Sequence, residues 1–346
     1  METAFILEKL ILVVIIFVVT LVIAMYSTLA ERKIAGFMQD RYGPDRAGIA
    51  GILQPLCDGG KFFFKEEIIP AGAHKSLFVL GPTLAIITAC ISSAVIPWGQ
   101  NLTIGDNTIS LQVADVNIGI LYIFGVIALG VYGIMLGGWA SNNKFSLMGA
   151  IRAASQSISY EIAMGLSIIA LLMVTQTLSL GEIVAQQSGF VNWNIWAQPL
   201  GFLIFMVCAF AECNRVPFDL PECETELVGG YHTEYSSMKL GLYMFSEYIN
   251  MFVSSSLMAA LYFGGYNFPF MYDLGLSENW ITIIGVIVFF LKIFGFIFFF
   301  MWIRWTLPRF RYDQLMNLGW KMLIPLAIAN IVLTGVITIV VDEYFK

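Results

Sequence analysis

Charged residues are scarce in this sequence of 346 residues. Aspartate, glutamate, lysine and arginine together make up 12% of it, whereas hydrophobic residues make up 58%. Soluble globular domains carry about twice that charged fraction, roughly 25%, so the composition excludes an ordinary soluble protein and predicts a polytopic membrane protein. The net charge of -6 says little about partners, because the position of each charge relative to the bilayer matters more than the sum.

The sequence also lacks the cysteine spacing of a metal or redox site. It contains no C-x-x-C pair, and only two histidines, His74 and His232, which are far apart. The five cysteines are Cys57, Cys90, Cys208, Cys213 and Cys223. This pattern argues against an iron-sulphur cluster, a disulfide framework or a haem site in the chain.

Long apolar runs, in contrast, are abundant, and a helix needs about 20 apolar residues to cross the hydrocarbon of a bilayer. We predict an all-α protein with eight transmembrane helices in a single membrane domain, residues 1–346. The first run is too long for a signal peptide and lacks a cleavage site, so we interpret it as a retained span. The fifth is short and bounded by Pro199. The predicted spans lie near residues 5–29, 77–98, 116–139, 160–177, 196–211, 240–264, 280–303 and 322–341.

Lysines and arginines predict the orientation of these spans. All of them except Lys9, Lys292 and Lys346 fall in alternate connections, and the other connections, such as 100–115 and 179–194, contain none. Because basic loops stay on the cytoplasmic side, both termini are predicted to face outward. The segment that follows the fifth span then faces the cytoplasm or matrix.

The first inner connection is long and contains turn signals at Gly43-Pro44 and Gly48. After them, residues 52–65 place apolar side chains near one helical face, with Pro55 in the first turn, where proline is tolerated. We interpret this stretch as an amphipathic helix lying in the membrane interface; the alternative is an ordinary surface helix.

The second inner feature is an acidic loop, residues 212–237, between two apolar runs. Pro217 and Pro221 prevent it from forming one unbroken helix. If the part after Pro221 is helical, Glu222 and Glu226 lie one turn apart on one face, where repulsion makes a carboxylate take up protons more readily. A proton-handling cluster and a solvated acidic loop are both compatible with this pattern.

Four ionisable residues fall within or beside predicted spans: Glu161, Glu212, Glu247 and Lys292. Because a charge at bilayer depth is costly unless it is paired or hydrated, each is a functional candidate. For Glu212, near the interface, snorkelling or a pair with Arg215 is an alternative. For Lys292, structural pairing with a glutamate and proton relay are both open.

Several long motifs carry a resemblance to a known family. They are AERKIAGFMQDRYGPDRAG, LQPLCDGGKFFFKEEIIP, AASQSISYE, AECNRVPFDLPECETELVGGYHTEYSSM and WIRWTLPRFRYDQLMNLGWK. Together they resemble the membrane subunit designated H of proton-pumping NADH:quinone oxidoreductase (respiratory complex I), the counterpart of mitochondrial subunit 1. The resemblance covers nearly the whole chain.

The resemblance implies a subunit of a translocase that binds no redox cofactor or metal itself and has no catalytic residue of its own. Quinone is the substrate, while NADH, FMN and the iron-sulphur clusters belong to partner subunits. The implied partners are the hydrophilic-arm subunits that carry the terminal cluster and the quinone headgroup site, and neighbouring small and antiporter-like membrane subunits. The implied location is the bacterial inner membrane, with both termini periplasmic.

The same resemblance assigns roles to individual residues, and quinone is expected to enter between the first span, the interfacial helix and the sixth span. The quinone-channel residues are Glu31, Arg32, Gln39, Arg41, Asp58, Lys61, Phe62 and Lys65. The proton-coupling residues are Glu161, Glu212, Asp219, Glu222, Glu224, Glu226, Glu234, Glu247 and Lys292, with Arg215 as a counterion.

Two other classes of protein compete with this assignment. A membrane anchor of a hydrogenase or ferredoxin-driven complex shares the membrane fold, but the intact RYGPDR motif and the complete acidic loop favour the quinone enzyme. A freestanding ion transporter often contains repeated halves, and this sequence has no second copy of any long motif.

Overall fold

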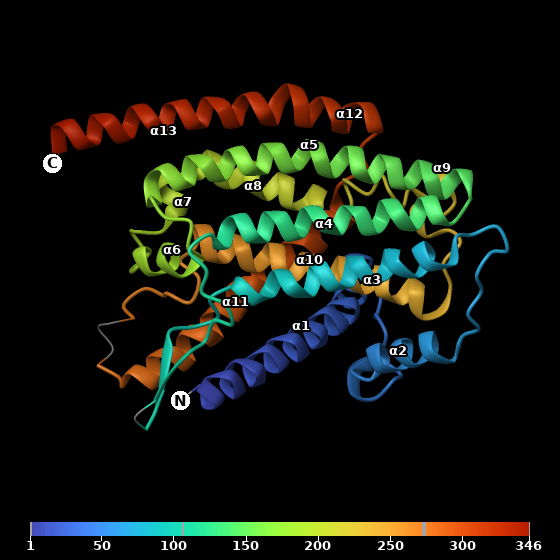
Figure 1. Ribbon diagram of the computed structural model, residues 1–346, viewed down its shortest axis with the longest axis horizontal. Coiled ribbons are helices and arrows are strands. Elements are labelled where there is room, and N and C mark those ends of the chain that lie inside the picture. Colours follow the sequence, from blue (N-terminus) through green and yellow to red (C-terminus); the bar gives the residue numbers. More distant parts are fainter. Residues whose placement is uncertain (1, 106, 272–274, 346) are drawn as a thin grey trace.

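The computed structural model describes residues 2–105, 107–271 and 275–345, so Met1 and Lys346 lie outside the described part. A helix is present at each of the eight predicted spans, and these helices form one bundle (Figure 1). They are α1 Glu2–Met38, α3 Lys75–Ser92, α4 Gly119–Ala140, α5 Lys144–Thr175, α8 Pro199–Glu212, α10 Ser237–Tyr262, α11 Glu278–Thr306 and α13 Ile324–Phe345.

Shorter elements connect these helices. The helical ones are α2 Gln54–Phe64, α6 Leu180–Gln186, α7 Asn194–Ala197, α9 Glu224–Leu227 and α12 Tyr312–Asn317, with 3-10 turns at Ile49–Gly51, Ser93–Val95 and Gly230–His232. A π-helical stretch, Leu318–Leu323, joins α12 to α13.

Six of the helices in the described residues are long and apolar enough to cross a membrane: α1, α3, α4, α5, α11 and the continuous run of α12 and α13. The prediction of a polytopic, predominantly α-helical membrane protein is therefore confirmed. α8 is shorter, with 14 residues, which at about 1.5 Å per residue reaches about 21 Å, less than the roughly 30 Å hydrocarbon core.

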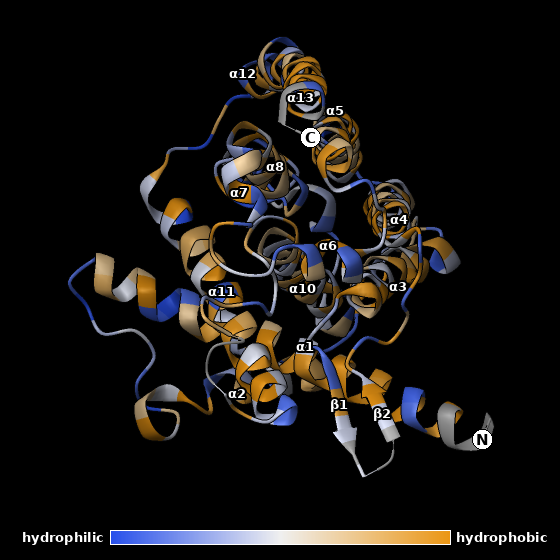
Figure 2. Cartoon of the chain, turned by 90° about the vertical axis from the view of Figure 1, so that its left-hand side faces the viewer, coloured by the Kyte–Doolittle hydropathy of each residue, from blue (hydrophilic) through white to orange (hydrophobic). Residues whose placement is uncertain are grey.

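α10 is long but more polar, because it lies in the middle of the bundle (Figure 2). Every residue from Met251 to Tyr262 is buried. The hydroxyls of Ser255 and Ser256 donate back to carbonyls of their own helix, at 2.7 and 2.8 Å. A helix surrounded by protein does not need an apolar outer face, so small and polar side chains are tolerated there.

Two helices extend well beyond the predicted spans. α1 continues nine residues beyond residue 29 and ends near Asp40, whose φ of 50° is the left-handed conformation typical of a helix end. α5 begins at Lys144, sixteen residues before the predicted start, because the Asn143 side chain accepts a hydrogen bond from the Phe145 amide at 2.9 Å and caps the helix.

The connection that follows α3 also contains a short β-hairpin that was not predicted. Strands β1 Asn101–Ile104 and β2 Asn107–Ser110 pair antiparallel, with Asn101 opposite Ser110. The Asn279 side chain of α11 accepts hydrogen bonds from the Thr103 amide and hydroxyl, at 2.9 and 2.7 Å. Strands of four residues are too short to show an alternating pattern in the sequence.

The acidic loop predicted at residues 212–237, called the acidic segment from here on, packs against α5. It does not form one helix, which is what Pro217 and Pro221 predicted. α9 begins only at Glu224, so Glu222 lies outside it and the condition under which Glu222 and Glu226 would share a helical face is not met. The segment approaches α5 closely at Gly149, where an added Cβ would lie 2.5 Å from the Tyr231 amide nitrogen. A side chain at this position would push the acidic segment away.

Candidate functional site

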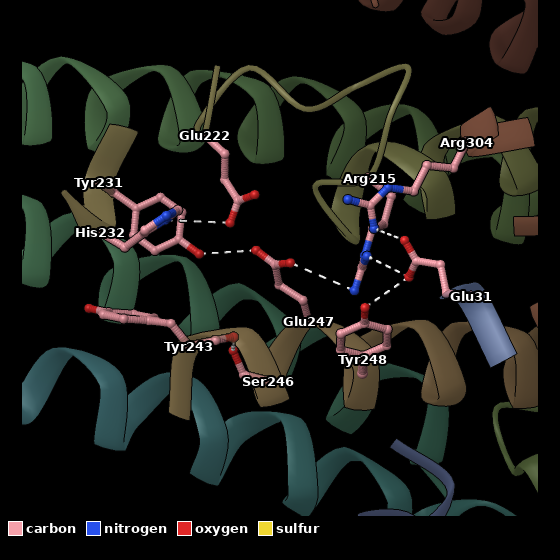
Figure 3. A network of polar contacts seen from close by, with 10 residues as sticks. All are labelled: Glu31, Arg215, Glu222, Tyr231, His232, Tyr243, Ser246, Glu247, Tyr248 and Arg304. Carbon is pink, nitrogen blue, oxygen red and sulfur yellow. Dashed lines mark hydrogen bonds and ion pairs between the residues drawn. The ribbon is translucent and has the colours of Figure 1, made fainter. Parts of the chain in front are cut away.

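A buried guanidinium, that of Arg215, is the centre of a polar network between α1, α10 and α11 (Figure 3). Its Nη1 atom lies 3.2 Å from Glu31 Oε2, and its Nη2 atom lies 3.8 Å from Glu247 Oε2. The Tyr248 ring centroid is 4.1 Å from its Cζ atom, and the Tyr248 hydroxyl donates to Glu31 Oε2 at 2.8 Å. Glu31 also pairs with Arg304. Burial disfavours the charge of Arg215, but the surrounding Tyr248, Glu31 and Glu247 raise its pKa overall.

The network continues from Glu247 into the acidic segment. The Tyr231 hydroxyl donates to Glu247 Oε1 at 3.0 Å, and burial raises the pKa of Tyr231 well above its usual value, so that it stays a donor. Glu222 Oε1 lies 3.5 Å from Nδ1 of His232. Burial raises the pKa of Glu222, with a further contribution from Asp219, and burial lowers the pKa of His232. Because His232 is neutral at neutral pH, it does not offset the burial of Glu222, and Glu222 binds a proton more readily than an exposed glutamate does.

A second ion pair joins the acidic segment to the chain beyond α11. Arg309 Nη2 lies 2.6 Å from Asp219 Oδ2, and Arg309 Nη1 lies 3.4 Å from Cys223 Sγ. Burial raises the pKa of Asp219 to about 6, although Arg309 opposes the shift. Asp219 Oδ1 is buried and has no hydrogen-bond partner among the described residues. Asp219 thus titrates closer to neutral pH than an ordinary aspartate.

Glu212 ends α8 and is not part of the Arg215 network. Its Oε2 atom is buried and receives no hydrogen bond from any described residue. A void of about 10 Å³ lies beside it, lined by Glu212, Ser254 and apolar side chains, close to the smallest volume that holds one water. Glu161 of α5 is only partly buried. Neither carboxylate belongs to the network of Figure 3.

Lys292 is held by backbone carbonyls. Its ammonium donates to the carbonyl oxygens of Phe263, Gly265 and Asn267, at 2.7, 2.8 and 2.6 Å, and lies 4.7 Å from the Trp193 ring centroid. These contacts use all three of its N–H donors. The described contacts of Lys292 therefore go to the chain that follows α10.

Three of the predicted proton-coupling residues lie at the edge of this arrangement. Glu224 and Glu226 are exposed, and Glu226 pairs with Arg152 at 2.6 Å. Glu234 accepts a hydrogen bond from the Asn143 side chain at 2.5 Å. The structure does not bring these three carboxylates into the network of Figure 3.

A cavity of about 550 Å³ lies between α1, α2 and α10. Its walls are almost entirely apolar, and Gly59, Gly60 and Gly241 leave space where larger residues would fill it. The lining side chains are Phe17, Leu21, Val22, Met25, Pro55, Leu56, Phe62, Phe63, Ile86, Met238, Leu242 and Phe245. This volume suits a flat apolar ligand of moderate size.

The predicted quinone-channel residues occupy different places around this cavity. Phe62 lines it, and Glu31 belongs to the Arg215 network. Arg32 pairs with Asp58 at 2.6 Å on the outside of α2, and Arg41 Nε donates to Gln39 Oε1 at 2.8 Å. The remaining two, Lys61 and Lys65, are exposed.

Sequence reasoning missed several members of the network as site residues, namely Tyr231, His232, Tyr248, Arg304 and Arg309. The sequence offered a weak signal for two of them. Tyr248 directly follows Glu247, and His232 lies inside the acidic loop. Arg304 and Arg309 were counted only as basic residues of an inner connection. Within the described residues, no group of three His, Cys, Asp or Glu side chains is arranged to hold a metal ion.

Comparison with known proteins identifies the family. The family model described as NADH dehydrogenase matches residues 10–335. The chain is 69% identical over 331 residues to an NADH-quinone oxidoreductase H subunit of Cytophaga hutchinsonii, covering 96% of each chain. It is 62% identical over 340 residues to the NADH-quinone oxidoreductase H subunit of Flavobacterium johnsoniae, covering 97% of each chain. These matches confirm the resemblance that the motifs indicated, and the chain belongs to the family of NADH-quinone oxidoreductase H subunits.

Proposed function

We propose that this chain forms the lateral opening through which quinone passes from the bilayer to the reducing site of the enzyme. The cavity between α1, α2 and α10 is the observation that carries the proposal. A quinone is a flat headgroup on an isoprenoid tail, and an apolar, phenylalanine-rich cavity at the membrane edge suits both parts. α2, with exposed Leu56, Phe63 and Phe64, lies in the membrane interface and forms the inner lip of the opening.

The opening lies close to the buried charges. Met25 lines the cavity and Glu31 is six residues further along α1, about 9 Å at roughly 1.5 Å per residue. Phe245 lines the cavity three residues before Tyr248 on α10. A headgroup that moves inward along these helices therefore approaches the Arg215 network before it reaches the partner subunits.

This network couples quinone reduction to proton translocation. Reduction of quinone to quinol takes up two electrons from the partner subunits and two protons. Until those protons arrive, the negative charge of the reduced headgroup raises the proton affinity of Glu247, Glu222 and Asp219. Asp219 and Glu222 already have raised pKa values, so a change of charge nearby alters their protonation more readily than that of ordinary carboxylates. Glu212 and Glu161 extend the route toward the antiporter-like subunits, with Lys292 near its end. Glu224, Glu226 and Glu234 form its cytoplasmic rim.

The proposed topology has eight spans in a single membrane domain. They are the six long apolar helices together with α8 and α10. Both termini face the periplasm, and the acidic segment and α2 face the cytoplasm. There they contact the hydrophilic-arm subunits that carry the terminal iron-sulphur cluster and the headgroup site. The chain supplies no redox cofactor, and NADH, FMN and the clusters remain with its partners in the bacterial inner membrane.

Replacement of Gly241 by Trp tests the opening. A Cβ at this position would already lie 3.4 Å from the Phe62 ring, so an indole fills the cavity. We expect quinone reduction by the assembled complex in membranes to fall at least about tenfold, while NADH oxidation by an artificial acceptor is unchanged. Leu129→Trp, on the exposed side of α4, is the matched control. Normal quinone reduction in an assembled Gly241→Trp complex would refute the opening.

A further inference from the structure

A second apolar groove lies directly beyond the cavity, on the outer half of α1 and α3. Its volume is about 360 Å³, and its walls are formed mainly by apolar side chains of these two helices, such as Val13, Ile16, Ile87 and Ile91. Ser93 is the single polar residue in its lining. Apart from Phe17 and Ile86, its lining residues belong neither to the opening nor to the charged network described above.

The groove and the cavity adjoin each other. They share two lining side chains, Phe17 of α1 and Ile86 of α3. Along α1 the combined lining runs from Val13 to Met25, about 18 Å at roughly 1.5 Å per residue. A chain that fills the cavity between α1, α2 and α10 can therefore extend along the seam between α1 and α3 without leaving an apolar wall.

The outer end of the groove is bounded by the connection that precedes α4. The Ala114 amide donates to the Ala94 carbonyl at 3.2 Å, and the Gln112 side chain donates to the Val95 carbonyl at 2.8 Å. Lys9 Nζ donates to the Gln112 carbonyl at 2.9 Å, which ties the same connection to the start of α1. The connection thus closes the outer end of the groove, and the inner end adjoins the cavity between α1, α2 and α10.

We propose that this groove binds the isoprenoid tail of the quinone whose headgroup occupies the cavity, an inference that rests on the proposed function. A tail that enters a bilayer has many conformations, and a groove that holds its first units on a rigid wall orients the headgroup toward the opening. A phospholipid acyl chain has the same apolar chemistry. The wall shared with the opening, Phe17 and Ile86, and the bounded outer end favour the quinone tail.

Two variants fill the groove from opposite walls without touching the cavity. Val13 of α1 and Ile91 of α3 are 47% and 44% exposed, so a larger side chain at either position has room to be accommodated. In the assembled complex in liposomes, we expect Val13→Trp and Ile91→Trp each to raise KM about fivefold for a long-tail quinone, with kcat unchanged. KM for a quinone with one isoprenoid unit stays at the wild-type value. Leu129→Trp, on α4, leaves both KM values unchanged.

The outcomes separate this inference from the proposed function. If the groove variants leave both KM values unchanged, or raise both equally, the tail groove is wrong, and the effect of Gly241→Trp on both quinones still supports the opening. If Gly241→Trp also has no effect, the opening itself fails.

A photoaffinity experiment identifies the occupant directly. A long-tail quinone with a diazirine on one of the first isoprenoid units of its tail should label residues 86–94 of wild-type complex, and excess unmodified long-tail quinone should remove the label. Labelling of the same residues by a diazirine phospholipid that excess quinone does not reduce would make the groove a lipid site and overturn the inference.

Discussion

Glu31 is the residue whose replacement tests the buried network most sharply. Its carboxylate accepts hydrogen bonds from Arg215, Tyr248 and Arg304. In Glu31→Gln the side-chain amide nitrogen is a hydrogen-bond donor that faces other donors. The guanidiniums of Arg215 and Arg304 also lose the negative charge with which they pair. Removing one partner of a buried ion pair costs about 3–5 kcal/mol. Because the Arg304 side chain is 30% exposed and water recovers part of the loss, we expect a cost of about 3 kcal/mol, at the lower end of that range.

The assay is the thermal inactivation of quinone reductase activity in membranes, with NADH oxidation by an artificial acceptor as the control for assembly. We expect Glu31→Gln to inactivate at a lower temperature than the wild type and the double variant Glu31→Gln/Arg304→Met to recover part of the loss, because it removes both charges. Stability within about 0.5 kcal/mol of the wild type in Glu31→Gln, or additive losses in the double variant, would show that Glu31 does not stabilise the two guanidiniums.

The remaining charged residues lead to three further predictions. Glu222→Gln should lower quinone reduction severalfold, whereas Glu226→Gln, which removes an exposed pair with Arg152 worth about 0.5 kcal/mol, should leave it near the wild-type rate; equal losses would contradict the separation of these two carboxylates. Because the pKa of Asp219 is raised from 3.8 to about 6, its contribution to stability is present below pH 3.8 and is lost as the pH rises to about 6. Asp219→Asn should flatten the thermal-stability profile over that interval, and an unchanged profile would exclude Asp219 as the titrating group. Lys292→Met leaves three carbonyls without their donor, so we expect faster thermal inactivation; a variant as stable as the wild type that also pumps normally would exclude both a structural and a charge role.

The spans could be predicted from the sequence because their signal is local. Each of the long apolar helices shows as a continuous run, and the lipid-facing side chains that make α1 and α11 recognisable are the ones that remain exposed, such as Val18 and Leu291. The ends of α1 and α5 could not be placed, because the Asn143 cap and the left-handed Asp40 are single-residue features that compete with the apolar pattern.

The site was predictable only in part, for a different physical reason. A buried carboxylate such as Glu247 is conspicuous in an apolar sequence, but its partners lie on other helices, at sequence separations that no spacing reveals. Glu31 and Arg304 are 273 positions apart and still form a pair. Within the acidic segment, no sequence pattern separates buried Asp219 from exposed Glu226, because that difference depends on how the segment packs on α5.

Electron cryo-microscopy of the assembled complex with a long-tail quinone shows directly whether quinone reaches the enzyme between α1, α2 and α10. We expect ligand density in the cavity beside Phe62 and Gly241, with its headgroup end toward Glu31 and Arg215. Density that enters between other helices, with this cavity filled by a partner protein of the complex, would contradict this entry route.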